Sequence, residues 1–211
     1  MPAKPTAIIV EVWHDVVCPW CRIGLANLQR AIVASGRPVE LRLRPYLLDP
    51  DAPAEGRDLR QWLGQKYGAD RIEAMFVRVT AVGAAAGVKF QFDAVRRGPA
   101  TLPAHATLLA VPAAQREAYL EAMHAAYFER GADIGDAKVL GELAASVGWS
   151  AAAAVAAASD ARLQAEARAS AASAGRSGIQ GVPHVVIAGR PLHGAQPTEA
   201  FAEALRVAPS L

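Results

Sequence analysis

The sequence predicts an α/β fold in which a strand–helix–strand unit and a strand–strand–helix unit enclose a long helical insertion. Two observations support this prediction. Strand-like segments at residues 8–13 and 39–46 flank an amphipathic helical segment, which is the pattern of a βαβ unit with parallel strands. Strand character returns after residue 178, at GVPHVVIAGRPLHG, and a helical segment follows it.

The first half follows from local patterns. Residues 8–13 form an apolar run with one charge, Glu11, as expected for a buried strand. The next segment keeps apolar residues at helical spacing until Ser35 and Gly36, which favour a helix end. Residues 39–46 alternate between apolar and charged side chains, so they are expected to form the second strand.

Between residues 57 and 178 the sequence predicts helices and no strand. Asp58 is the expected N-cap of the first of these helices. The others are expected at residues 70–86, 105–111, 114–130, 136–147 and 151–175, with a break near Ser159.

The chain is expected to end with a hairpin and a helix. The hairpin pairs residues 185–188 with residues 191–193, and the helix has Thr198 as its N-cap. We therefore assign residues 1–56 and 179–211 to one discontinuous domain and residues 57–178 to a helical insertion domain.

Composition narrows the classes of partner. The 211 residues carry a net charge of +2 without a run of Lys or Arg, so neither nucleic acid nor an anionic membrane is an expected partner. The N-terminus shows no signal-peptide pattern and no apolar stretch is long enough to span a bilayer, so we expect a cytoplasmic protein. Whether it is a monomer or a homodimer is left open.

The only two cysteines of the chain, Cys18 and Cys21, form Cys-Pro-Trp-Cys where the first helix should begin. Cys18 is expected at the N-cap and Pro19 at the first helical position. The amides of Trp20 and Cys21, together with the helix dipole, should stabilise a thiolate on Cys18. Cys18 is the predicted nucleophile because its position is nearer solvent, and Cys21, one turn deeper, should resolve a mixed disulfide. Pro19 and Trp20 are expected to influence the redox potential.

Two other interpretations of the cysteines are weaker. A structural zinc site needs four ligands, and the chain has no second Cys-x-x-Cys. His105, His124, His184 and His193 show no ligand spacing, so no metal or resident cofactor is expected. Two inert buried thiols are disfavoured because a proline follows Cys18 and a strand precedes the motif.

Neighbouring residues leave alternatives open. Asp15 is more readily interpreted as a cap of the turn than as a proton acceptor. His14 either tunes the thiol or, as we favour, is a structural histidine at a strand end. His105 lies either near the site or on the surface. The tryptophans elsewhere are expected to pack in the core or line a groove: Trp13, Trp62 and Trp149.

Several motifs together resemble a known family. DVVCPWCRIG, LRPYLLDPDAPAEGRDL, AYFERGADIGD, GIQGVPHVVI and HGAQPTEAF are similar to the FrnE-type branch of DsbA-like thioredoxin-fold oxidoreductases. That branch is related to kappa-class glutathione transferases and to hydroxychromene-carboxylate isomerases. The resemblance implies a thioredoxin-like fold with a large α-helical insertion, a redox pair at Cys18 and Cys21, and a cis-proline at Pro183.

Pro183 opens the predicted hairpin, where proline is tolerated because it starts a strand. In a thioredoxin-like fold this position faces the cysteine pair. A cis Val182–Pro183 bond would turn the main-chain N–H and C=O of Val182 outwards, beside Cys18. These groups are expected to pair with an extended substrate.

Three functions compete at this stage. The first is exchange between thiols and disulfides of a protein or a small molecule, and two thiols at this spacing favour it. The second is a glutathione-dependent transferase or isomerase, with glutathione as a co-substrate. The third is a chaperone-like binding protein in which the helical insertion offers an apolar groove.

Overall fold

The structure is a computed structural model that describes residues 7–209. Its mixed four-stranded sheet has the order β2–β1–β5–β6. β1 (Ile8–His14) pairs in parallel with β2 (Val39–Pro45), as the βαβ prediction required. β5 (His184–Ile187) pairs antiparallel to both β1 and β6 (Arg190–His193), which confirms the predicted hairpin.

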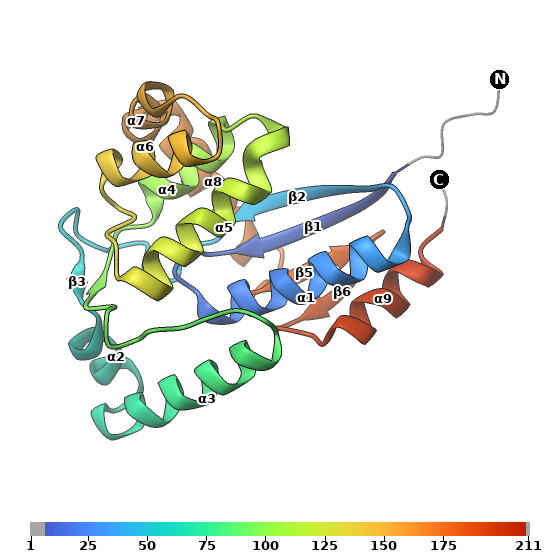
Figure 1. Ribbon diagram of the computed structural model, residues 1–211, viewed down its shortest axis with the longest axis horizontal. Coiled ribbons are helices and arrows are strands. Elements are labelled where there is room, and N and C mark those ends of the chain that lie inside the picture. Colours follow the sequence, from blue (N-terminus) through green and yellow to red (C-terminus); the bar gives the residue numbers. More distant parts are fainter. Residues whose placement is uncertain (1–6, 210–211) are drawn as a thin grey trace.

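Two helices pack together on one face of this sheet (Figure 1). They are α1 (Pro19–Ser35) and α9 (Thr198–Val207). Alternate residues of β1 are buried, and they pack against apolar side chains of both helices. α1 ends at Gly36, whose φ of 59° is left-handed. Thr198 is the first residue of α9 and Pro197 precedes it as the N-cap, so the predicted capping role of Thr198 was wrong.

The segment between β2 and β5 is mainly helical. Asp58 caps α2, as predicted, because its carboxylate accepts a hydrogen bond from the Gln61 amide. The predicted break near Ser159 also occurs, where Asp160 ends one helix and caps the next. The helices are α2 (Leu59–Tyr67), α3 (Ile72–Ala85), α4 (Leu102–Ala110), α5 (Ala113–Arg130), α6 (Ala137–Ser146), α7 (Ala151–Ser159) and α8 (Ala161–Arg176), with a 3₁₀ turn at Ala69–Arg71.

The prediction that this segment has no strand was wrong. β3 (Arg57–Asp58) pairs antiparallel with β4 (Arg97–Gly98). Two residues are too few to show an alternating pattern, so no strand could be recognised there from the sequence. Residues 1–6 and 210–211 of the assigned discontinuous domain lie outside the described residues.

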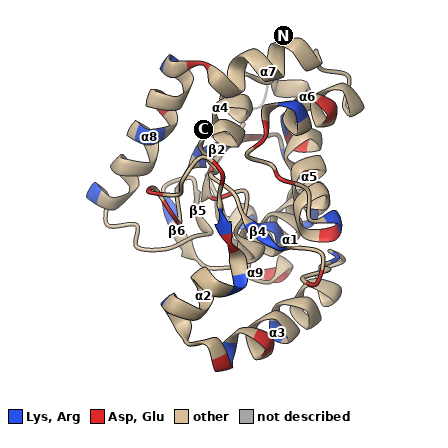
Figure 2. Cartoon of the chain, turned by 90° about the vertical axis from the view of Figure 1, so that its left-hand side faces the viewer, with Lys and Arg blue, Asp and Glu red and all other residues tan. Residues whose placement is uncertain are grey.

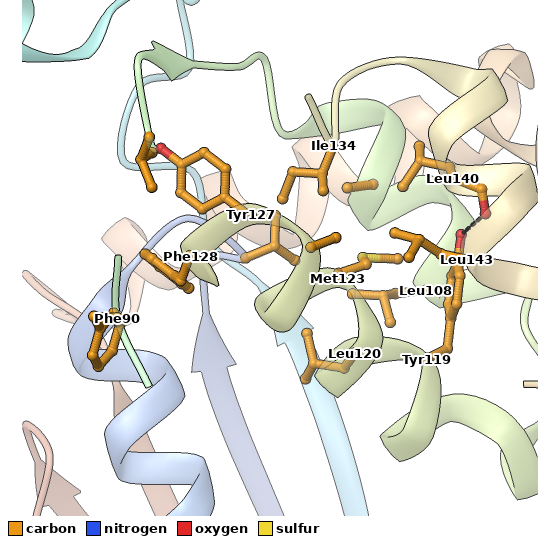
Figure 3. Packing of buried hydrophobic residues seen from close by; sticks show 14 of the residues in the cluster. Phe90, Leu108, Tyr119, Leu120, Met123, Tyr127, Phe128, Ile134, Leu140 and Leu143 are labelled. Atoms are coloured by element: carbon orange, nitrogen blue, oxygen red, sulfur yellow. Dashed lines mark hydrogen bonds between the residues drawn. The ribbon is translucent and has the colours of Figure 1, made fainter. Parts of the chain in front are cut away.

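The inserted helices form two groups around α1. In Figure 1, α4 to α8 lie above the sheet, and α2 and α3 lie below α1. A large core joins both groups to α1; its aromatic centre includes Phe90, Tyr127 and Phe128 (Figure 3). The Tyr119 hydroxyl donates a hydrogen bond to the Leu140 carbonyl oxygen at 2.9 Å. Since Val16 and Ile23 belong to the same core, the insertion packs directly against the cysteine motif.

Charges are mixed over the visible face. Figure 2 shows acidic and basic side chains interspersed along α3 and around α5, instead of gathered by sign. Within residues 7–209, no helix has both the length and the apolar character that crossing a bilayer would require.

Candidate active site

The cysteine motif begins α1 as predicted. Cys18 is the N-cap in an extended conformation and Pro19 follows it at the first helical position. The Cys18 amide donates to the Asp15 carbonyl oxygen at 3.0 Å, and the Cys21 amide donates to the Cys18 carbonyl oxygen at 3.0 Å. Within the described chain, the Cys18 side chain forms no capping hydrogen bond with the helix amides. The predicted amide contact from Cys21 to the sulfur is therefore absent, because that amide closes the first helical turn.

The proline loop lies against the first thiol. The Val182–Pro183 bond is cis, and the Cys18 Sγ donates a hydrogen bond to the Val182 carbonyl oxygen at 3.8 Å. Gly24 of α1 makes this approach possible, since a Cβ there would lie 3.0 Å from the Pro183 Cγ. The fold thus brings together two segments that are 164 positions apart.

The two thiols differ in access. Both are free, with Cys18 4% exposed and Cys21 0% exposed. Burial raises the pKa of Cys21 well above its usual value, and the adjacent Cys18 raises it further. Cys18 also lines a pocket, whereas Cys21 lies behind it. The accessible sulfur is therefore that of Cys18.

The pocket beside Cys18 is largely apolar and has a volume of about 520 Å³. This volume falls in the range of small-molecule sites. Its cations are Arg57, which pairs with Asp49 at 2.8 Å, and Lys66, which lies 5.1 Å from the Trp62 ring centre. Aromatic rings from several segments line it: Trp20, Tyr46, Trp62, Tyr67, Phe76, Phe92, Tyr127 and Phe128.

Asp15 does not cap the turn with its side chain, so that interpretation was wrong. Its carboxylate is fully buried and accepts a hydrogen bond from the Leu48 amide at 2.8 Å. The other carboxylate oxygen lies 3.3 Å from the His105 Nε2. The main-chain carbonyl of Asp15, instead of its carboxylate, closes the turn to Cys18. The alternative role as a proton acceptor stays a prediction.

Two predicted histidines meet behind the motif. His14 is buried, and its ring centre lies 5.4 Å from that of His105. Burial lowers the pKa of His14 well below its usual value, and nearby His105 and His124 lower it further. His105 is fully buried, so the surface alternative was wrong.

Sequence reasoning missed other residues of this region. Arg22, directly after the motif, is 3% exposed and donates to Glu121 at 2.7 Å and to Glu129 at 2.6 Å. These bonds tie the first turn of α1 to α5. Trp20 and Trp62 line the pocket, as the predictions for them allowed. His124 and the other aromatic pocket residues escaped prediction, because no spacing in the sequence links them to the cysteines. Among residues 7–209, no group of three or more His, Cys, Asp or Glu side chains is arranged to hold a metal ion.

Two thiols at a helix start, one accessible and one buried, facing a cis-proline loop define a thiol–disulfide oxidoreductase. The family model of the DSBA-like thioredoxin domain matches residues 9–206, and the chain belongs to this family. The fold is thioredoxin-like with a helical insertion between β2 and β5. The activity of the chain, as a member of this family, is thiol–disulfide exchange.

Solved structures agree with this assignment. A probable DsbA oxidoreductase from Streptomyces coelicolor is 32% identical with a TM-score of 0.84, over 95% of this chain and 89% of that chain. A 2-hydroxychromene-2-carboxylate isomerase shares the fold at 13% identity and a TM-score of 0.70, over 94% of each chain. The cytosolic disulfide reductase DsbM from Pseudomonas aeruginosa, solved with GSH, shares it at 20% identity and a TM-score of 0.60, over 93% of each chain. No curated protein matches the chain.

Proposed function

We propose that the chain exchanges thiols and disulfides through a mixed disulfide on Cys18, which Cys21 then resolves. The observation that carries this proposal is the placement of the two sulfurs. Cys18 lies at a pocket and beside the Val182 carbonyl, while Cys21 is buried behind it. A substrate sulfur in the pocket can therefore reach Cys18 and not Cys21.

The reaction has two balanced steps. The Cys18 thiolate attacks one sulfur of the substrate disulfide, the substrate S–S bond breaks, and the other substrate sulfur leaves as a thiolate. Cys21 then loses its proton and attacks the Cys18 sulfur, which releases the second substrate thiolate and forms the Cys18–Cys21 disulfide. Two electrons pass from the protein to the substrate, and the reverse sequence oxidises a dithiol.

The pocket suggests what lies next to the reacting sulfur. Its aromatic lining favours an apolar group, and its volume fits a small molecule or a single large side chain of a protein. The Val182 carbonyl, which accepts from Cys18 in the free thiol state, is positioned to accept from a substrate main-chain amide. Pro19 and Trp20 line the same pocket, and we assign them the tuning of the thiol.

Replacing Cys21 by serine is expected to trap the intermediate. Cys18 still attacks, but without the second thiol the mixed disulfide persists. Incubation of the reduced Cys21→Ser protein with an aromatic disulfide should add about one substrate half per chain, as the two-step scheme requires. Intact-mass spectrometry before and after dithiothreitol measures the adduct. The parent protein, treated alike, should end as an unmodified intramolecular disulfide; a stable adduct on the parent, or none on Cys21→Ser, contradicts the proposal.

We also assign the chain to the FrnE-type branch, place it in the cytoplasm and give it glutathione as a partner thiol. The motif set around Cys18 and Pro183 supports the branch. DsbM, a structural neighbour, is described as cytosolic and was solved with GSH. Equilibration in glutathione buffers, with alkylation of free thiols, should convert the pair between its dithiol and disulfide forms. A disulfide that dithiothreitol reduces and glutathione does not would contradict this partner.

The glutathione transferase or isomerase alternative rests on relatives of the same fold. That chemistry needs no second thiol in the motif, whereas this chain places one directly behind Cys18. Conjugation of glutathione to chlorodinitrobenzene that survives replacement of both cysteines would favour this alternative over disulfide exchange. Suppression of aggregation that also survives the double replacement would favour the chaperone-like alternative.

A further inference from the structure

Four charged side chains of the described chain line the pocket beside Cys18, and three of them already have partners. Asp15 is fully buried, and its carboxylate accepts a hydrogen bond from a main-chain amide. Arg57 pairs with Asp49 at 2.8 Å. The fourth is Lys66, and among residues 7–209 no carboxylate lies within ion-pair distance of its Nζ. The pocket therefore has one positive charge without a counter-ion.

The Lys66 ammonium group lies over aromatic rings of the same pocket. Its Nζ is 5.1 Å from the ring centre of Trp62 and 5.5 Å from that of Tyr67. Trp62 precedes Lys66 by four residues in α2, so the two side chains share one face of the helix. A cation within about 6 Å of a ring centre is attracted to the face of the ring. These contacts hold the charge of an exposed lysine at the pocket instead of leaving it free in solvent.

The rest of the lining is mostly apolar and offers flat surfaces. Phe76 and Phe92 stack with their ring centres 4.2 Å apart and their planes 7° from parallel, and both line the pocket. Aromatic rings pack well against another ring in an offset stack or edge to face. The volume of about 520 Å³ suits a small molecule. An aromatic group that carries one negative charge matches both the lining and the unmatched cation.

We propose that the substrate is the disulfide of a small aromatic thiol that carries an acidic group, and that Lys66 selects for this group. This proposal rests on the proposed function, since it names the substrate of the first exchange step. The ring packs in the pocket, its sulfur lies at Cys18, and the acidic group pairs with Lys66. The Cys18 thiolate bonds to this sulfur, the substrate S–S bond breaks, and the other half leaves as a thiolate.

Desolvation explains why a neutral aromatic ligand fits less well. A ligand that fills the pocket removes water from one side of the Lys66 ammonium, and an unpaired charge loses free energy when it loses water. An acidic group on the ligand replaces that water with a counter-ion. Glutathione has no aromatic group, and in this scheme it is the partner thiol instead of the ligand of the pocket.

Lys66 also has a structural role that the test must separate. It lies in the last turn of α2, where a basic side chain stabilises a helix through the helix dipole. Loss of this stabilisation would lower the free energy of unfolding and would affect every substrate alike. A comparison of two substrates in the same variant is therefore the decisive measurement.

The first measurement compares the rates of Cys18 attack on a charged and a neutral aromatic disulfide. Dithiobis(nitrobenzoate) has a carboxylate on each ring, whereas dithiodipyridine is uncharged, and each releases an absorbing thiol product. In Lys66→Gln the rate ratio of the charged to the neutral disulfide should fall by about fivefold, the scale of one partly exposed ion pair. Lys66→Arg should keep the parent ratio. Salt should lower the ratio in the parent protein more than in Lys66→Gln, because it screens the ion pair.

Arg71 provides the matched control. It is exposed, lies in the 3₁₀ turn that follows α2 and does not line the pocket. Arg71→Gln removes the same net charge and should change the ratio by less than about twofold, since a distant exposed charge is screened. An equal fall in Arg71→Gln would reduce the effect to net charge and overturn the role of Lys66, as would a parent ratio retained in Lys66→Gln.

A binding measurement separates this proposal from the proposed function. Nitrobenzoate and nitrobenzamide contain no sulfur, so their binding does not depend on exchange, and quenching of Trp20 and Trp62 fluorescence reports it. Nitrobenzoate should bind the parent protein more tightly than the amide by about threefold or more, and Lys66→Gln should bind both equally. Equal binding by the parent protein would overturn the proposed substrate class. A parent protein that shows this preference but exchanges with neither disulfide would instead refute the proposed function.

Discussion

Replacing Cys18 by serine is expected to lower the rate of disulfide exchange by at least about a thousandfold, because a neutral hydroxyl cannot replace the attacking thiolate. The remaining thiol, Cys21, is 0% exposed and burial raises its pKa, so it is a poor substitute for the missing nucleophile. Release of coloured thiolate from dithiobis(nitrobenzoate) under excess reagent measures the rate.

The Cys18→Ser protein carries its own control, since the chain has two cysteines and one remains. Unfolded in denaturant, the variant should release one equivalent of thiolate rapidly, which shows that Cys21 is intact. If the folded Cys18→Ser protein reacts with dithiobis(nitrobenzoate) as fast as the parent, Cys21 is accessible and the assigned roles of the two thiols are reversed. Circular dichroism of the native variant establishes that the fold persists.

Replacing Gly131 by alanine is expected to destabilise the fold by about 2–5 kcal/mol, from left-handed strain together with overpacking. Gly131 ends α5 with a φ of 66°. A Cβ there would lie 2.0 Å from the Ala94 carbonyl oxygen, so the main chain itself must move. The displaced segment adjoins Phe92, which lines the pocket, and exchange activity should fall with stability. The shift in the urea unfolding midpoint measures the loss.

Gly36→Ala is the matched control for this prediction. Gly36 ends α1 with a φ of 59°, but nothing lies within 4 Å of the position a Cβ would take. This variant should lose about 1 kcal/mol, the left-handed cost alone. If both variants lower the free energy of unfolding by the same amount, the close approach of Ala94 to Gly131 does not affect stability, and the packing described at the end of α5 is wrong.

The parts of the fold that depend on neighbouring residues could be predicted from the sequence. Asp58 and the break near Ser159 are examples, because a side chain that caps a helix acts within three residues of its own position. The parallel pairing of residues 8–13 with 39–46 followed from the short helical connection between them. Cys18 at the N-cap and Pro19 after it were predictable for the same local reason.

The errors at the candidate site concern groups whose partners lie far away in the sequence. Asp15 turns its carboxylate towards Leu48 and His105, which a local capping rule cannot foresee. The Cys18 thiol faces Val182 instead of the helix amides for the same reason. The sequence alone does not place His105 at the site or on the surface, because a histidine in a helical pattern does not reveal which residues cover it.

The sequence by itself determined the reactive group and the class of chemistry, since two thiols separated by two residues at a helix start are a local arrangement. Tertiary structure alone decided what surrounds them. It buried Cys21 completely behind Cys18, built the aromatic pocket from separate helices, and placed three histidines behind the motif. Burial and long-range contacts depend on how distant segments pack, and this packing cannot be predicted from local sequence patterns.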